Sequence, residues 1–229
     1  MKNLYLYLFF VPMCILVSHN ANAANVLQSD WDDVVDGDCD DQGAGWWSSS
    51  EAIRISENVL LYQKDIGGWY KNIDDLHRVL TQDDKNDLIE AKSNNAGCTI
   101  DNGAVWLEMT YLSKVYAAIS DSTTKANIKT GFLKGIQYLL EAQYDNGGWP
   151  QFYPLRGGYS NHITYNDDAM THAMQILMHI YLKDGHFSIT PPDSTITDAE
   201  DAFNKGIECI LNTQYVQQGL LTSWCAQHH

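Results

Sequence analysis

Acidic and amide residues at two predicted helix starts are the first candidates for chemistry in this sequence. Asp101 and Asn102 precede one apolar-periodic segment, and Asn166, Asp167 and Asp168 precede another. One Asp or Asn at such a place is expected as a helix cap, because its side chain accepts hydrogen bonds from free backbone amides. Capping explains one residue per helix and not two or three in a row. Because calcium takes hard oxygen ligands, Asp101, Asn102, Asp167 and Asp168 are candidate calcium ligands.

The stretch before the second acidic group, residues 147–165, is rich in glycine, proline and aromatic residues and is predicted to be a loop. Aromatic side chains here and after the earlier Gly67-Gly68 pair either stack on sugar rings or cover the core: Trp69, Trp149, Phe152, Tyr153 and Tyr159. Tyr153 and Tyr159, which lie among glycines and prolines, are the best candidates for stacking. Lys64, Lys71 and Arg156 are the basic residues closest to these loops, as solvated surface residues or, for Lys71 and Arg156, as partners for an anionic substrate.

The elements that must position these residues are helices. Apolar residues recur with helical spacing in five segments, which are residues 51–62, 103–119, 126–144, 169–182 and 199–215. Few stretches alternate as strands do. The sequence therefore predicts an all-α protein.

The helical segments also repeat. Gln63 and Gln143 each end a helix and are followed by Gly-Gly-Trp, and Gln214 followed by Gly219 is a third copy. A second set interleaves with the first, since residues 99–104 align with residues 164–169. This pattern is typical of helix hairpins stacked into an α/α toroid, here an incomplete barrel, with both signatures opening onto one rim.

Composition and the N-terminus indicate an exported, folded protein. The chain has 229 residues, 45% of them hydrophobic, and a net charge of −15, which argues against nucleic acid and anionic membranes as partners. An anionic polymer would need bridging cations. Residues 1–23 read as a signal peptide with a positive start, an apolar run and Ala21-Asn22-Ala23 at the cleavage site, so the mature chain is expected outside the cytoplasm. No later segment is apolar for long enough to span a membrane.

Residues 24–50 form an acidic, turn-rich lead-in, and residues 51–229 form the toroid domain. The run from Asp36 to Asp40 resembles a calcium loop only faintly, because no Glu closes it. In an exported chain Cys39, Cys98, Cys209 and Cys225 allow two disulfides of undetermined connectivity, or remain free buried thiols.

The segment GGWPQFYPLRGGYSNHITYNDDAM, residues 147–170, resembles the signature of the pectate lyases of polysaccharide lyase family ten, and a looser similarity extends from about residue 51 to the end. The resemblance implies an α/α toroid and β-elimination on polygalacturonate. It also implies calcium bridging enzyme carboxylates to the uronate, while an arginine removes the C5 proton. By this resemblance Asp101 and Asp167 or Asp168 are the calcium or catalytic carboxylates, with Asn102 beside them.

Two departures from the family pattern bear on activity. Tyr70 stands where the family usually has proline, and Trp224-Cys225-Ala226-Gln227-His228 is normally followed by a long segment that carries the proton-abstracting arginine. That arginine is not found here, so we expect the N-terminal part of a lyase domain with weak or no activity by itself.

Two other functions compete with the lyase. The run from Lys134 to Trp149 also fits the Gln/Trp repeat of triterpene cyclases, and Asp38-Cys39-Asp40-Asp41 imitates their acidic motif, although it lies outside the helical repeats. The other is a non-catalytic protein that binds pectin and calcium.

Overall fold

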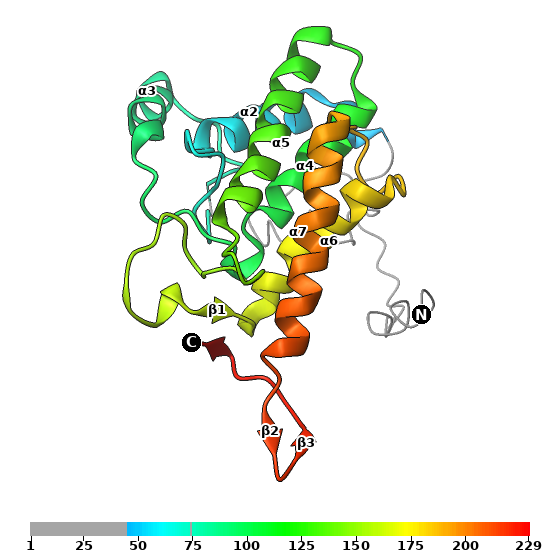
Figure 1. Ribbon diagram of the computed structural model, residues 1–229. Coiled ribbons are helices and arrows are strands. Elements are labelled where there is room, and N and C mark those ends of the chain that lie inside the picture. The colour runs from blue at the N-terminus through cyan, green and yellow to red at the C-terminus, as the bar shows by residue number, and fades with distance from the viewer. Residues whose placement is uncertain (1–44, 74) are drawn as a thin grey trace, which may run out of the picture.

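The structure is a computed structural model that describes residues 45–73 and 75–229 (Figure 1). The predicted signal peptide, most of the acidic lead-in, the cyclase-like acidic motif and Cys39 lie outside the described residues. The described part opens with the 3-10 turn η3 (Trp46–Ser48), whose Trp47 packs edge-on against Tyr111 of the core.

Two interleaved sets of helices form the body of the protein, which is all-α as predicted. The first set is α2 (Ser50–Tyr62), α5 (Ser122–Ala142) and α7 (Asp193–Asn212), and the second is α4 (Trp106–Ala118) and α6 (Ala169–Leu182). Along the chain each helix packs on the next, and helices of one set also contact each other (Figure 1). The result is an incomplete α/α toroid.

Two helices begin earlier than the apolar pattern predicted, because polar residues form their first turns. Helix α5 begins four positions early because the Asp121 side chain accepts a hydrogen bond of 2.7 Å from the Thr124 amide. Helix α7 begins at Asp193 rather than near residue 199. Helix α3 (Gln82–Glu90) and the 3-10 turn η4 (Ala91–Ser93) were not predicted, because α3 buries no residue and so carries no apolar periodicity.

Hydrogen bonds confirm the predicted repeat between the first two copies. Gln63 Nε2 donates to the carbonyls of Gly67 and Gly131, and Gln143 Nε2 donates to those of Gly147 and Ala202, at 2.8–3.0 Å. Each glutamine therefore ties its own turn to the next helix of the first set. The two tryptophans repeat as well, because Trp69 and Trp149 each donate 2.8 Å bonds to a carbonyl ten residues upstream.

Glycine is required at the first position of each Gly-Gly pair. Gly67 and Gly147 have φ of 98° and 88°, and a Cβ atom would lie 2.2 Å and 2.1 Å from the backbone oxygens of Lys134 and Lys205. Gly148, which the sequence also places in the turn, does not have positive φ. A Cβ there would instead meet Ile163 at 2.6 Å, so close packing is what selects glycine.

The third copy of the turn departs from the first two. After Gln214 the chain forms a hairpin of β2 (Val216–Gln217) and β3 (Leu220–Leu221), which projects beyond the end of α7 (Figure 1). The last pair, β1 (Ile163–Thr164) with β4 (Gln227–His228), lies close to the helix bundle. Within residues 45–73 and 75–229, no helix has the length and apolarity to cross a bilayer.

Candidate functional site

Two 3-10 turns with the same backbone shape bring the acidic groups together. Turn η5 (Asp101–Gly103) leads to α4 and turn η7 (Asn166–Asp168) leads to α6, and the two turns lie side by side. Asn102 has φ, ψ of 52°, 41°, and Asp167, its counterpart in the repeat, has 52°, 35°. Left-handed backbone is uncommon outside glycine and most accessible to Asn and Asp, which explains these residue types.

The connections between helices are joined across repeats by short backbone bridges. Thr99 pairs with Phe152, Pro150 pairs with Ile163, and β1 pairs with β4. The Thr99–Phe152 bridge fixes the first acidic turn to the loop after Gly147-Gly148-Trp149, and the β1–β4 pair fixes the second to the segment after the divergent third copy. The Pro150–Ile163 bridge closes the loop between them, so these connections form the single rim expected for a toroid.

Asp101 is the most buried carboxylate of the site, with 1% of its surface exposed. Its Oδ2 atom accepts a hydrogen bond of 2.7 Å from Gln151 Nε2 and forms an ion pair with Lys71 Nζ. Its Oδ1 atom has no hydrogen-bond partner among the described residues. A buried carboxylate oxygen without a donor is costly, so Oδ1 is an acceptor suited to a ligand.

The other predicted ligands are accessible. Asn102, Asp167 and Asp168 are exposed. Asp168 occupies the N-cap position of α6, but its side chain makes no cap hydrogen bond, so capping does not account for this carboxylate. Asn102 Nδ2 donates to Asn72 Oδ1 at 3.0 Å, and Asp167 Oδ2 accepts from Asn166 Nδ2 at 2.6 Å.

The donor set suits a hard cation but does not form a closed cage. Among the described residues, no three His, Cys, Asp or Glu side chains converge on one point where they could hold a metal ion. Carboxylate and amide oxygens from two adjacent turns, one of them buried and unpaired, are the ligand types that calcium takes. The arrangement therefore fits a cation whose coordination is completed by water or by a bound anion.

The predicted sugar-binding residues divide into buried and accessible groups. Trp149 was predicted to contact substrate, and this is corrected: it is fully buried and its indole N–H is bound to Leu139, so it is a core residue. Tyr159 is 63% exposed, and Tyr153 is half-buried against the Tyr138 ring. The exposed Arg156 guanidinium lies 3.4 Å from the centroid of the Phe152 ring.

Two glutamines at the rim were missed by sequence reasoning. Gln151 binds Asp101, and Gln227 Nε2 donates to Asn166 Oδ1 at 2.7 Å in the next repeat, one position further along the backbone, because Thr99 pairs with Phe152 whereas Thr164 pairs with Gln227. Both follow a tryptophan of the repeated turn by two or three positions. Because the spacing differs by one residue, extending the repeat alignment past the tryptophan pairs Gln151 with Ala226 and would not have found both glutamines.

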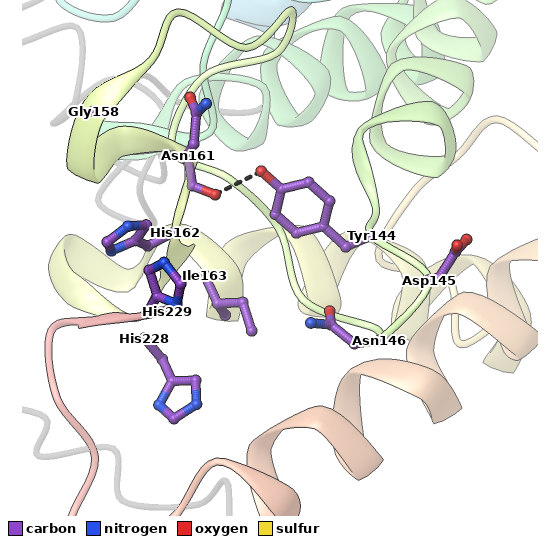
Figure 2. A pocket seen from close by; sticks show the side chains of 9 residues that line it. All are labelled: Tyr144, Asp145, Asn146, Gly158, Asn161, His162, Ile163, His228 and His229. Atoms are coloured by element: carbon purple, nitrogen blue, oxygen red, sulfur yellow. Dashed lines mark hydrogen bonds between the residues drawn. The ribbon is translucent and has the colours of Figure 1, made fainter.

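A pocket of about 670 Å³ lies beside the β1–β4 pair (Figure 2). At the edge of the pocket, the Tyr144 hydroxyl donates a hydrogen bond of 2.6 Å to the Asn161 carbonyl. The His162 and His229 rings pack edge-on, with their centroids 4.8 Å apart. None of the residues predicted from the sequence to act in the site lines this pocket. It is lined by Tyr144, Asp145, Asn146, Gly158, Asn161, His162, Ile163, His228 and His229.

The three described cysteines, Cys98, Cys209 and Cys225, are free thiols, so they form no disulfide with one another. Burial raises the pKa of Cys98 to about 12, which keeps this thiol protonated and unreactive at neutral pH. Cys98 and Cys209 are buried and contribute to packing, whereas Cys225 is partly exposed.

The fold and the rim together define an α/α toroid protein with acidic and amide oxygens gathered between its helix starts. The family model for pectic acid lyase matches residues 63–229, and this chain belongs to that family. The triterpene cyclase alternative is thereby set aside. No curated protein matches the chain significantly.

Solved structures of relatives agree with this assignment. The family 10 polysaccharide lyase from Cellvibrio cellulosa is 33% identical to this chain, with a TM-score of 0.60 over 85% of this chain and 56% of that one. A mutant of a family 10 polysaccharide lyase from the same organism, in complex with trigalacturonic acid, is also 33% identical to this chain. Its TM-score is 0.61, over 85% of this chain and 57% of that one. The chain thus spans little more than half the length of these structures.

Proposed function

We propose that this chain binds polygalacturonate through calcium at the rim and carries part of the site for β-elimination of pectate. The observation that carries the proposal is the buried Asp101 carboxylate, whose Oδ1 atom has no partner among the described residues and which lies on a turn adjacent to that of Asp167 and Asp168. Family membership and the trigalacturonic acid complex of the Cellvibrio lyase support the same ligand class.

Each rim residue has a role in this proposal. Asp101, Asn102, Asp167 and Asp168 hold the cation, and Asp101 and Asp168 are the carboxylates through which catalysis is assisted. Bound calcium would neutralise the uronate carboxylate and so acidify the adjacent C5 proton. Lys71 and Arg156 contact other uronate carboxylates, and Tyr153 and Tyr159 stack on sugar rings.

Electrostatics favours a cation-bridged complex. With a net charge of −15, the protein repels a polyuronate unless cations intervene. Calcium at the rim would provide that bridge, and the predicted signal peptide would place the protein in the extracellular space or the periplasm.

A second function, pectate binding without elimination, is favoured by the placement of the arginines. Arg54 donates to the carbonyls of His77 and Arg78 at 2.8 Å and 2.7 Å, and Arg78 pairs with Asp84 at 3.1 Å. Arg156 is the remaining arginine of the chain and the remaining candidate base.

Both functions are tested in one series with the chain and polygalacturonate. We expect binding that needs calcium, is abolished by chelator, and is weakened by Asp101→Asn and Asp168→Asn but not by Asp193→Asn, an exposed carboxylate elsewhere. The near-ultraviolet absorbance of the unsaturated uronide reports elimination, which we expect to be weak. Robust product that disappears in Arg156→Met would identify Arg156 as the base. Polygalacturonate binding that changes neither with calcium nor with the rim substitutions would refute the proposed function.

A further inference from the structure

Gln151 is joined to the Asp101 turn by its backbone and by its side chain. Its carbonyl accepts hydrogen bonds from the Ile100 amide at 3.3 Å and from the Thr99 hydroxyl, and its own amide donates to the Ser160 carbonyl at 3.0 Å. Its side chain is only 5% exposed and donates through Nε2 to Asp101 Oδ2. These backbone bonds do not depend on the side chain, whose Oε1 atom is left for another role.

Two oxygens of this buried pair lack a donor. Asp101 Oδ1 and Gln151 Oε1 are both buried, and within residues 45–73 and 75–229 neither has a hydrogen-bond partner. Lys71 Nζ and Gln151 Nε2 both contact Asp101 Oδ2 and not its Oδ1 atom. Leaving two buried acceptors unpaired is costly, and one cation bound by both oxygens would satisfy them together.

The next repeat provides a partial comparison, because Gln227 lies one position further along its strand than Gln151: Thr164 pairs with Gln227, whereas Thr99 pairs with Phe152. Gln227 binds Asn166 as Gln151 binds Asp101, but Gln227 Oε1 accepts a hydrogen bond of 3.0 Å from Thr164 Oγ1. In the Gln151 repeat, the corresponding hydroxyl of Thr99 donates to the Gln151 backbone carbonyl instead. The unpaired amide oxygen is therefore particular to the repeat that holds a buried carboxylate.

From this we infer that Gln151 is a calcium ligand. Its Nε2 atom holds Asp101 Oδ2 and leaves Oδ1 free, and its Oε1 atom is a second oxygen for the same cation. The inference rests on the proposed calcium site and adds one ligand to it. Gln151 is uncharged and lies outside both acidic groups, so the sequence did not mark it as a ligand. Amide carbonyl oxygens are ordinary calcium ligands, so the chemistry is suitable.

The test is calcium titration of the full chain by calorimetry, with thermal unfolding as a second readout. Gln151→Met removes both polar atoms and is expected to weaken calcium binding about tenfold or more. Gln151→Glu keeps an oxygen ligand and is expected to bind calcium within about threefold of the parent, or more tightly. The matched control is Gln63→Met, which removes a buried glutamine away from the acidic turns and should lower stability without changing calcium affinity.

The outcomes separate this inference from the proposed function. If Gln151→Met binds calcium like the parent, or Gln151→Glu loses as much affinity as Gln151→Met, Gln151 is not a ligand. The proposed calcium site survives that result as long as Asp101→Asn still loses calcium. A parent chain that binds no calcium overturns both. If Gln151→Met unfolds, the test uses Gln151→Glu alone. Calcium should then raise the unfolding midpoint of Gln151→Glu as much as that of the parent, and a smaller shift would overturn the inference.

Discussion

At the scale of single residues, the Lys71–Asp101 pair places a positive charge where calcium is proposed to bind. Lys71 Nζ is paired with Asp101 Oδ2, and its side chain is 34% exposed while that of Asp101 is 1% exposed. Two cations compete for one carboxylate, so the lysine and calcium oppose each other at this residue. Contact of Lys71 with a uronate carboxylate would release Asp101 to the cation, which links substrate binding to calcium binding.

Lys71→Met is therefore expected to tighten calcium binding by about 1 kcal/mol, roughly fivefold in Kd, and to weaken binding of polygalacturonate. Calorimetric titration of the variant with each ligand measures both effects. Lys114→Met, which removes a charge that lies over the Trp47 ring away from the rim, is the control and should change neither. Weaker calcium binding in Lys71→Met would mean that the lysine supports the cation site rather than competing with it.

At the scale of elements, the Gly-Gly-Trp turn fastens each first-set helix to the next. The glutamine at the helix end binds the following helix, and the first glycine allows the chain to pass against a backbone carbonyl of that helix. Because the turn precedes the loop that carries Gln151, distortion of the turn would be transmitted to the rim.

Gly147→Ala is expected to destabilise the fold by about 2 kcal/mol or more, since it combines left-handed backbone with a clash against the Lys205 carbonyl. Gly157→Ala is the matched control: its φ is 97°, but a Cβ atom there meets nothing within 4 Å, so a loss of about 1 kcal/mol is expected. Urea denaturation followed by circular dichroism measures both. Equal losses in the two variants would show that the contact with α7 adds nothing.

At the scale of the whole molecule, the third turn leaves apolar surface in water. In the first two repeats this turn packs on a following helix, whereas the hairpin formed by β2 and β3 projects from the body (Figure 1). The large hydrophobic residues around it are 41–69% exposed, and they are Tyr215, Val216, Leu220, Leu221 and Trp224. Clustered apolar surface of this kind promotes association.

We expect the chain to self-associate at micromolar concentrations and Leu221→Lys to shift it toward the monomer. Sedimentation velocity across a concentration series gives the distribution. Val79→Lys is the control, because Val79 is 72% exposed but lies far from the hairpin in sequence, and it should leave association unchanged. A parent that stays monomeric throughout the series would contradict the expectation.

The sequence by itself determined the helical class, the repeat and the two acidic turns, because these depend on local spacing. Apolar periodicity marks a helix that buries one face, and Gln63 and Gln143 before their glycines mark the same turn twice. Helix α3 escaped prediction for the same reason, since it buries no face.

Only the tertiary structure decided the environment of each candidate residue. Trp149 and Tyr159 belong to the same loop sequence, yet one is a core residue and the other is exposed. The pairing of Asp101 with Lys71 and Gln151 joins three segments distant in the chain, and the unpaired oxygens at this site follow from that pairing. Burial and hydrogen bonding between distant segments depend on how the helices pack, and no local pattern records them.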